Sequence, residues 1–308
     1  MKHFINLKDI KISDLRKILR DSKRRKYKRK NLNTLVVDKD APLKGKILIQ
    51  MFEKPSLRTR LSFYLAIRQL GGGTITLRSN ELHLGKGGES LADTARILST
   101  YGDGFMLRTD SDKKINDFVK YIKIPLINGL SPSSHPTQVL SDVFTVEEIK
   151  KKPISKLNIC WIGDSNNVLN SLIAASVKFS FKLSIGCPNK YRPKKTILDW
   201  AKNNKKKINI FDDPKKAVKN ADVIFSDKVI SMNDKVNKIK KTKDFEKFYI
   251  NDSLLKLAPK SIFLHCLPRG KEVSDQVFLG KKSHVWEQAL NRVHVQKSIL
   301  LYCFNKLR

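Results

Sequence analysis

Four short stretches of this chain gather the side chains that could do chemistry. They are Ser56-Leu57-Arg58-Thr59-Arg60, His135-Pro136-Thr137-Gln138, Asp227 to Met232, and His265-Cys266-Leu267-Pro268. The first stretch follows an apolar run over 47–52, typical of a buried strand, and precedes a helical pattern over 61–70. Such a turn offers backbone N–H groups and the positive end of a helix dipole, which suits an anion. Ser56 could cap the helix, while Arg58 and Thr59 could bind phosphate oxygens; the alternative is a capped helix with surface arginines.

The elements that must position these residues alternate along the whole chain. Apolar runs typical of strands lie at 47–52, 104–108, 125–130, 157–162, 183–186, 208–211, 222–226 and 261–265. Helical patterns between them predict an α/β fold with parallel sheets covered on both faces. A break at Lys151-Lys152-Pro153 predicts two domains, 1–150 and 151–286, each with a central parallel sheet flanked by helices.

Chemistry-bearing side chains follow the predicted strands at their carboxyl ends, which is where ligands bind in such sheets. These residues are Arg58, Arg108, His135, Asn167, Asp227 and Cys266. The chain has no Gly-x-Gly-x-x-Gly turn, so the pattern predicts no nucleotide site.

The charge balance raises a nucleic-acid alternative. The 308 residues carry a formal net charge of +33, from 62 basic and 29 acidic side chains. The basic runs, such as 23–30 and 238–243, are scattered and mostly lysine, without interleaved aromatic residues for base stacking. This pattern favours solvated surfaces over a specific nucleic-acid site.

Cysteine usage and hydropathy bear on the compartment. The four cysteines, at 160, 187, 266 and 303, show no Cys-x-x-Cys spacing, which predicts reduced thiols in a cytoplasmic protein. The N-terminus lacks the apolar core of a secretory signal, and its Asp9 and Asp14 are unlike a transit peptide. No apolar run approaches about 20 residues, so we expect no membrane span.

In their order and content, the four motifs resemble the ornithine carbamoyltransferase family, over essentially the whole chain. The first two are similar to motifs of carbamoyltransferases generally, and the last two to the ornithine-specific branch. The resemblance implies transfer of a carbamoyl group from carbamoyl phosphate to the δ-amine of L-ornithine, giving L-citrulline and phosphate, as in arginine biosynthesis. It implies no cofactor and no metal, an active site in a cleft between the two domains, and a final helix (287–308) that packs back on the first domain.

The resemblance also implies a role for individual residues. The residues that it assigns to carbamoyl phosphate are Ser56, Leu57, Arg58, Thr59, His83, Arg108, His135, Gln138, Cys266, Leu267 and Arg292. Arg108 and His135 would donate to the developing oxyanion, and the Cys266 thiol would position or deprotonate the attacking amine. Ornithine would be held by Asn167, Asp227, Ser231 and Met232, with Asp227 on the α-ammonium group.

The resemblance also implies a mode of assembly, and two residues of this chain differ from those usual in the family. The family forms trimers, which implies a homotrimer in which His83, in the segment 81–85, completes a neighbour's site. Asn233 stands where the family often has glycine, and Val229 where it often has an aromatic residue. Two alternatives stay open: a carbamoyltransferase for another amine, such as acylated ornithine or putrescine, and a basic nucleic-acid-binding protein on an inactive enzyme fold.

Overall fold

The computed structural model describes residues 1–78, 88–230 and 237–307, and the chain forms two compact units. Unit 1 comprises Met1–Ser141 with Leu290–Arg308, and unit 2 comprises Asp142–Ala289. The two positions at which the chain leaves one unit and enters the other lie within helices, namely α5 (Pro136–Lys150) and α12 (Val285–Cys303).

Unit 1 is built on a four-stranded parallel sheet in the order β2-β1-β3-β4. Its strands are β1 (Ile47–Phe52), β2 (Gly73–Arg78), β3 (Gly104–Arg108) and β4 (Leu126–Leu130). The strand order reverses between β1 and β3, and ligands of such sheets bind beyond the carboxyl ends at this point. Phe52, the last residue of β1, pairs with Arg78 on one side and Arg108 on the other, so arginines flank the loop that begins the first motif.

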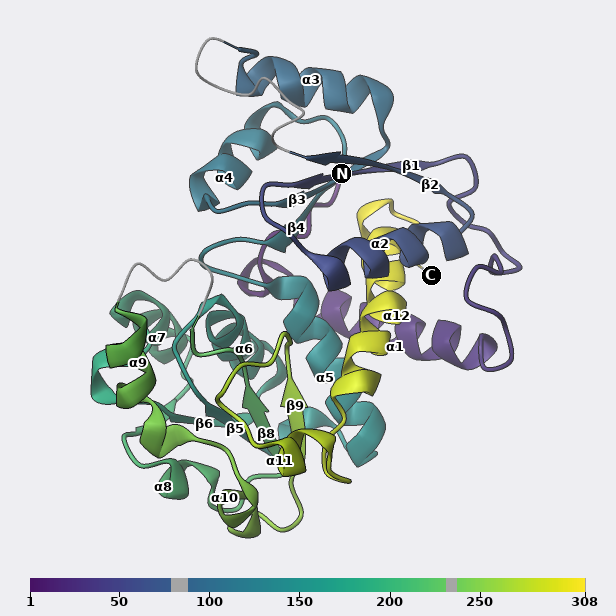
Figure 1. Ribbon diagram of the computed structural model, residues 1–308. Helices are drawn as coiled ribbons and strands as arrows, with labels where there is room; N and C mark the ends of the chain where they lie inside the picture. The colour runs from purple at the N-terminus through teal and green to yellow at the C-terminus, as the bar shows by residue number, and fades with distance from the viewer. Residues whose placement is uncertain (79–87, 231–236, 308) are drawn as a thin grey trace. The chain divides into compact units, whose positions relative to one another are not determined.

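Helices cover both faces of this sheet (Figure 1). They include α1 (Ile12–Lys28), α2 (Leu57–Gln69), α3 (Leu91–Tyr101) and α4 (Asp112–Tyr121). Ile49 and Phe105 pack with Leu98 of α3 and Phe118 of α4 in one apolar cluster. Figure 1 shows α2 and α12 on the opposite face. The alternation of the strand side chains therefore supplies both apolar surfaces.

The first basic run is mostly exposed, as expected of a solvated surface, but two of its arginines are an exception. Helix α1 continues through it, and Arg25 and Arg29 are buried. Asp38 accepts from Arg25 Nη1 at 3.0 Å and from Arg29 Nη1 at 2.8 Å. Asp21, one turn before Arg25, accepts from its Nε at 3.1 Å. Buried guanidinium groups are retained here because carboxylates neutralise them.

Unit 2 holds a five-stranded parallel sheet in the order β7-β6-β5-β8-β9. Its strands are β5 (Asn158–Ile162), β6 (Lys182–Gly186), β7 (Asn209–Phe211), β8 (Val223–Ser226) and β9 (Ile262–His265). Its helices include α6 (Asn167–Phe179), α7 (Lys195–Asn203), α8 (Pro214–Val218), α9 (Lys238–Asp244), α10 (Asp252–Lys256) and α11 (Asp275–Leu279). The prediction of two α/β domains, each with a central parallel sheet flanked by helices, is confirmed.

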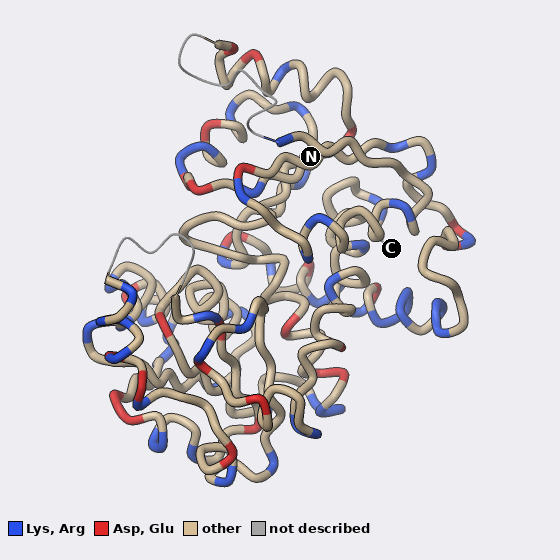
Figure 2. Tube along the Cα trace, in the orientation of Figure 1, with Lys and Arg blue, Asp and Glu red and all other residues tan. Residues whose placement is uncertain are grey.

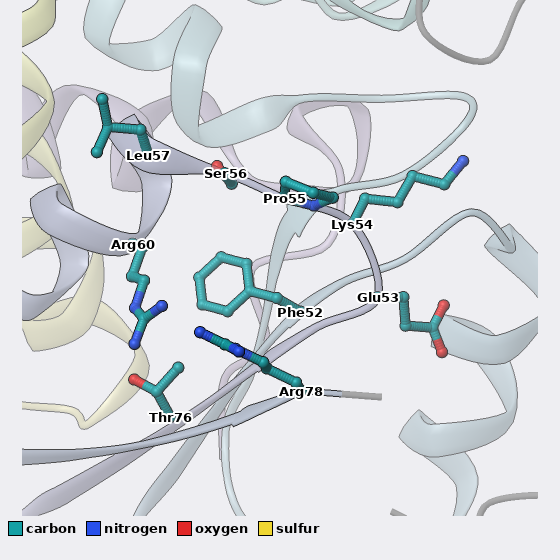
Figure 3. Close-up of a pocket in the computed structure, with 9 residues that line it drawn as sticks. All are labelled: Phe52, Glu53, Lys54, Pro55, Ser56, Leu57, Arg60, Thr76 and Arg78. Carbon is teal, nitrogen blue, oxygen red and sulfur yellow. The ribbon is translucent and has the colours of Figure 1, made fainter. Parts of the chain in front are cut away.

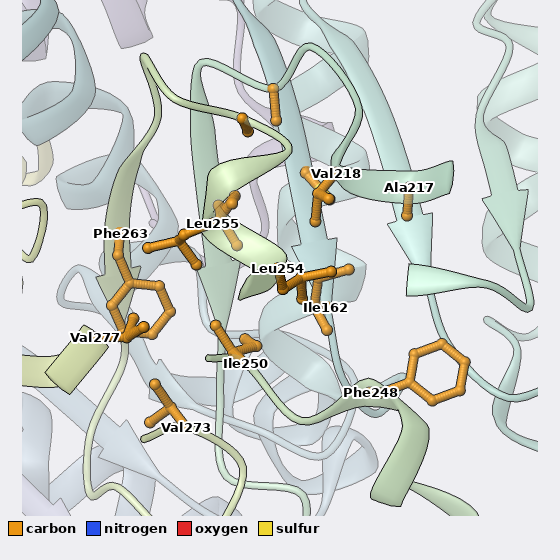
Figure 4. Close-up of a cluster of buried hydrophobic side chains, with 14 of the residues drawn as sticks. Ile162, Ala217, Val218, Phe248, Ile250, Leu254, Leu255, Phe263, Val273 and Val277 are labelled. Carbon is orange, nitrogen blue, oxygen red and sulfur yellow. The ribbon is translucent and has the colours of Figure 1, made fainter. Parts of the chain in front are cut away.

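The core of unit 2 fixes the ends of its strands. Ile162 and Phe263 meet Ala217, Leu254 and Val277 from the short helices in the cluster drawn in Figure 4. This packing anchors β5 directly before the β5–α6 loop and β9 directly before the fourth motif. No helix within the described residues is long and apolar enough to cross a membrane. The four cysteines are all buried thiols.

Candidate active site

The first motif lies at the beginning of α2. Ser56 is the N-cap residue, with φ −157° and ψ 105°, but its hydroxyl makes no capping hydrogen bond. Ser56 therefore stands at the N-cap position, as expected, but the expected capping by its side chain is absent. The first turn of α2 keeps backbone N–H groups that no Ser56 side chain occupies, which is the arrangement that binds anions. Leu57 begins the helix with its side chain exposed.

Thr59 joins several parts of unit 1 through one hydroxyl oxygen. Thr59 Oγ1 accepts a hydrogen bond from Arg292 Nη2 at 2.8 Å and a longer one from Arg108 Nη1 at 3.4 Å. Arg292 Nη1 donates to Gln138 Oε1 at 2.7 Å. The cluster thus draws one residue each from α2, β3, α5 and α12, and we call it the Thr59 cluster: Thr59, Arg108, Gln138 and Arg292.

Burial and like charge set the electrostatics of this cluster. Burial, with the nearby charge of Arg58, lowers the pKa of Arg108 to about 10. Burial also holds the pKa of His135 well below its usual range, and Arg292, Arg108 and Arg58 lower it further. His135 is therefore neutral at pH 7 and can donate only one N–H. Cations that crowd together in a buried place favour an anionic ligand.

Arg108 offers a more specific indication of a ligand. Its Nε atom is buried and has no hydrogen-bond partner among the described residues. Its backbone is held, because Glu53 N donates to the Arg108 carbonyl at 3.0 Å. The Glu53 carboxylate in turn accepts from Thr109 Oγ1 and Lys114 Nζ, which ties the loop after β1 to the segment after β3. A buried guanidinium N–H with no acceptor is costly unless a ligand supplies one.

An open pocket borders the loop after β1 that begins the first motif. A pocket of about 530 Å³ is lined by Phe52, Glu53, Lys54, Pro55, Ser56, Leu57, Arg60, Thr76 and Arg78. In Figure 3 the guanidinium groups of Arg60 and Arg78 lie near Thr76 and the ring of Phe52. Arg60 therefore lines this pocket, and no member of the Thr59 cluster is among the described residues of its walls.

The third motif meets the β5–α6 loop where the strand order of unit 2 reverses. Asn166 caps α6, since its Oδ1 accepts from Val168 N at 3.0 Å and from Leu169 N at 3.1 Å. Its Nδ2 donates to Asp227 Oδ2 at 2.7 Å. Asp227 Oδ1 accepts from the backbone N–H of Lys228 at 2.8 Å. Both carboxylate oxygens of Asp227 are thus oriented by fixed donors.

Burial raises the pKa of Asp227, although the hydrogen bonds from Lys228 and Asn166 oppose the rise. The turn after β5 requires Gly163, whose φ of +141° is open to glycine alone among ordinary residues. A Cβ at this position would lie 3.5 Å from Ser226 Oγ, an ordinary contact distance, so the backbone conformation and not the space requires the glycine.

The remaining predicted residues of unit 2 lie at the same carboxyl edge. Asn167 begins α6, half-buried, and its carbonyl accepts from Ser171 Oγ. Cys266 directly follows β9, buried, and its N–H donates to the Ser226 carbonyl over a long 3.4 Å. Leu267 follows with φ +58°. His83, Ser231 and Met232 lie outside the described residues, as does Asn233.

Known proteins resemble both halves of the chain. Residues 2–148 match the family model described as "Aspartate/ornithine carbamoyltransferase, carbamoyl-P binding domain". Residues 155–303 match its companion, the "Asp/Orn binding domain". The chain belongs to the aspartate/ornithine carbamoyltransferase family.

Members of this family with curated names are similar along nearly the full length. The ornithine carbamoyltransferase of Brucella suis biovar 1 (strain 1330) is 41% identical over 306 residues, which are 98% of this chain and 96% of the relative. That of Agrobacterium fabrum (strain C58) is 39% identical over 98% of this chain and 97% of the relative. The resemblance to the family that the motifs indicate is therefore confirmed.

Solved structures of the family agree. The ornithine carbamoyltransferase from Pyrococcus furiosus matches with a TM-score of 0.92 at 37% identity, covering 100% of this chain and 98% of that one. The anabolic ornithine carbamoyltransferase from Campylobacter jejuni matches with a TM-score of 0.89 at 36% identity, covering 99% and 100%.

In this member of the aspartate/ornithine carbamoyltransferase family, residues that the sequence pattern did not single out also support the site. Asn166 orients Asp227, and the available signal was an asparagine in the polar turn after the apolar run 157–162. Glu53 fixes the loop beside Arg108. Lys241, inside a basic run, is buried and bonds Asp164 at 2.6 Å, two residues before Asn166. Nothing in a lysine-rich run distinguishes the one lysine that folds inward.

Proposed function

We propose that this chain transfers the carbamoyl group of carbamoyl phosphate to the δ-amine of L-ornithine. The observation that carries the proposal is the Thr59 cluster: the buried Arg292 and the half-buried Arg108 share one hydroxyl oxygen beside a helix N-terminus. Such a site suits a small ligand that combines a phosphate with a carbonyl group. The curated relatives and solved structures named above carry the same activity in their names.

The phosphate of carbamoyl phosphate is assigned to the N-terminus of α2. Ser56, Leu57, Arg58 and Thr59 supply its first turn, so backbone N–H groups, hydroxyls and one guanidinium can all donate to phosphate oxygens. Arg58 is close enough to lower the pKa values of Arg108 and His135 through its charge. A dianion between these groups would remove that repulsion.

The carbonyl oxygen is assigned to Arg108 and His135. When the amine attacks, the carbonyl carbon becomes tetrahedral and its oxygen gains negative charge. Neutral His135 and the Nε–H of Arg108 would donate to that oxygen. Arg292 and Gln138, which bond each other, are assigned to the carbamoyl end of the same ligand.

The acceptor is assigned to the carboxyl edge of the sheet in unit 2. Asp227, with both oxygens oriented, would hold the α-ammonium group of ornithine, and Asn167 its backbone. Cys266 would lie near the δ-amine, which must lose a proton before it can attack. A new C–N bond then forms, the C–O bond to phosphate breaks, and phosphate leaves. Ser231 and Met232 are assigned to the acceptor by the family resemblance alone.

The proposal includes the assembly of the protein, its compartment and its metabolic role. We infer a homotrimer in which His83 of one subunit completes the carbamoyl phosphate site of another, on the family resemblance. Reduced, buried cysteines suit a cytoplasmic enzyme of arginine biosynthesis. Lys and Arg lie on many elements of each unit (Figure 2), and the densest run, along the end of α1, uses Arg25 and Arg29 in buried ion pairs, which favours no specific nucleic-acid partner.

The test is product formation by the purified protein. With carbamoyl phosphate and L-ornithine, citrulline and phosphate should appear in equal amounts. Parallel reactions with putrescine, N-acetylornithine and aspartate address the alternative acceptors. Arg58→Ala should lose most of the activity, because a charge-assisted contact is worth about 1.5–3 kcal/mol. Failure of the wild-type protein to make citrulline, or a higher kcat/KM with another amine, would overturn the assignment.

A further inference from the structure

His265 and Glu272 form a buried pair beneath the fourth motif. His265 ends β9, and its side chain is fully buried, as is nearly all of Glu272. His265 Nε2 lies 3.1 Å from Glu272 Oε1. The imidazole packs between the rings of Phe263 and Phe278, at 6.2 Å from each centroid. Phe263 belongs to the apolar cluster of Figure 4, so the pair sits on a rigid part of unit 2.

The hydrogen bonds of this pair determine the tautomer of His265. The backbone N–H of Leu267 donates to His265 Nδ1 at 2.9 Å. Because Nδ1 accepts, the proton of the neutral ring lies on Nε2, which donates to Glu272. Glu272 Oε1 also accepts from Gly270 N at 2.6 Å. Burial alone would raise the pKa of Glu272, but the bonds from His265 and Gly270 outweigh it and lower that pKa.

The same bonds support an unusual backbone conformation. Leu267 has φ +58°, in the left-handed region that side-chain-bearing residues rarely adopt. Such a residue persists where the surroundings hold it, and this is common at functional sites. Here the Leu267 N–H has a buried acceptor, and that acceptor is itself fixed by Glu272. The pair therefore determines the direction in which Cys266 and Leu267 present themselves at the carboxyl edge of the sheet.

We propose that His265 and Glu272 are positioning residues for the transfer reaction. His265 Nδ1 holds the Leu267 N–H, and Glu272 holds His265 in the tautomer that can accept it. Together they fix the turn that carries Cys266 and Leu267. The kinetic part of this inference rests on the proposed function, whereas its structural part does not.

Two substitutions separate the two ring nitrogens. In His265→Asn the amide oxygen can take the place of Nδ1 and accept from Leu267. In His265→Gln the amide reaches toward Glu272 and leaves the Leu267 N–H without an acceptor. We expect kcat/KM for ornithine to be roughly ten- to a hundredfold lower in the Gln variant than in the Asn variant, which is the usual effect of an unsatisfied buried donor. A role in packing alone predicts the reverse order, because Gln fills the space better.

A second pair tests Glu272 without altering His265. Glu272→Gln keeps an oxygen that can accept from His265 and Gly270, so its activity should stay near that of the wild type. Glu272→Leu removes the acceptor and should fall to the level of His265→Gln. Equal activities in the two Glu272 variants would overturn the proposal. This pair also decides the matter should His265→Gln fail to fold.

A direct readout does not depend on turnover. In protein labelled with ¹⁵N-leucine, the Leu267 amide, assigned by its loss in Leu267→Met, should exchange slowly with deuterium in the wild type and in His265→Asn. It should exchange faster in His265→Gln. Exchange in the wild type as fast as in an exposed loop would overturn the proposal. A wild-type protein that makes no citrulline yet protects this amide would refute the proposed function and leave the positioning of the turn intact.

Discussion

Thr59 connects three elements of unit 1 through one atom. Its single hydroxyl oxygen accepts from two arginines that belong to different elements. Without that oxygen, buried guanidinium groups would face each other with less to offset their repulsion. Removing an acceptor from a charged, buried donor costs about 1–3 kcal/mol, so one atom has a large effect here.

Thr59→Val tests this directly, because valine keeps the shape and removes the oxygen. We expect affinity for carbamoyl phosphate to fall roughly ten- to a hundredfold, from the loss of about 1.5–3 kcal/mol. Calorimetric titration with carbamoyl phosphate measures the change. Thr59→Ser keeps the hydroxyl and serves as the matched control. Equal affinities in the two variants would remove Thr59 from the site.

Asp227 should give acceptor binding a characteristic pH dependence. Only the carboxylate form can bind an α-ammonium group, and burial raises the pKa of Asp227 above its ordinary value. As pH falls, binding should therefore weaken at a higher pH than an ordinary aspartate would allow. L-norvaline, which keeps the α-ammonium group and lacks the δ-amine, is a suitable calorimetric ligand.

In Asp227→Asn the same ligand should bind weakly and without that pH dependence, while carbamoyl phosphate binds as in the wild type. An unchanged pH profile in the variant would show that another group causes it.

At the scale of elements, α9 shows how one inward lysine positions a helix. Lys241 Nζ bonds Asp164 Oδ2 at 2.6 Å, with 3% of the lysine side chain and 17% of the aspartate exposed. The ammonium also lies 5.5 Å from the centre of the Tyr191 ring. Asp164 belongs to the same loop as Asn166, so this ion pair connects α9 to the loop that orients Asp227.

Breaking this ion pair should destabilise unit 2. Lys241→Met leaves a partly buried carboxylate without its partner, which typically costs about 3 kcal/mol or more. Adding Asp164→Asn removes the second charge and should recover most of the loss. Urea unfolding of the single and double variants measures both changes. A double variant no more stable than Lys241→Met would show that the pair does not position α9.

At the scale of the whole molecule, the proposed trimer makes a prediction about mixed assemblies. Arg58→Ala chains keep His83, and His83→Ala chains keep Arg58. A closed ring with shared sites gives each subunit's site one residue from a neighbour. Each mixed ring of three then contains one site with both groups present.

The two variants, each nearly inactive alone, can be unfolded and refolded together in equal amounts. Random assembly makes about three-quarters of the rings mixed, so roughly a quarter of all sites should recover activity. Carbamoyl transfer by the mixture, compared with each variant refolded alone, measures the recovery. If His83→Ala alone is inactive and mixing restores nothing, the shared-site proposal fails.

The sequence by itself determined most strands and the places of the motifs. The runs at 47–52 and 104–108 are strands with the predicted bounds, because continuous apolar runs in a parallel sheet are legible without tertiary contacts. Strand β2 went unpredicted, because it begins at the last of three consecutive glycines and its residues are at most partly buried at the edge of the sheet. The short polar helices α4 and α9 were missed as well, since their patterns are brief and rich in lysine.

Only the tertiary structure decided which polar side chains meet. Thr59 and Arg292 share a hydrogen bond across 233 positions of sequence, and no local pattern records that distance. No local pattern records the ion pairs of Arg25 and Lys241 either. Both residues belong to basic runs, and both are buried because each forms an ion pair with a carboxylate. Local periodicity reports the hydrophobic face of each element, and that is enough to build the sheets. The pairing of buried charges is a property of the packed chain, since it depends on partners that only the completed fold brings within reach.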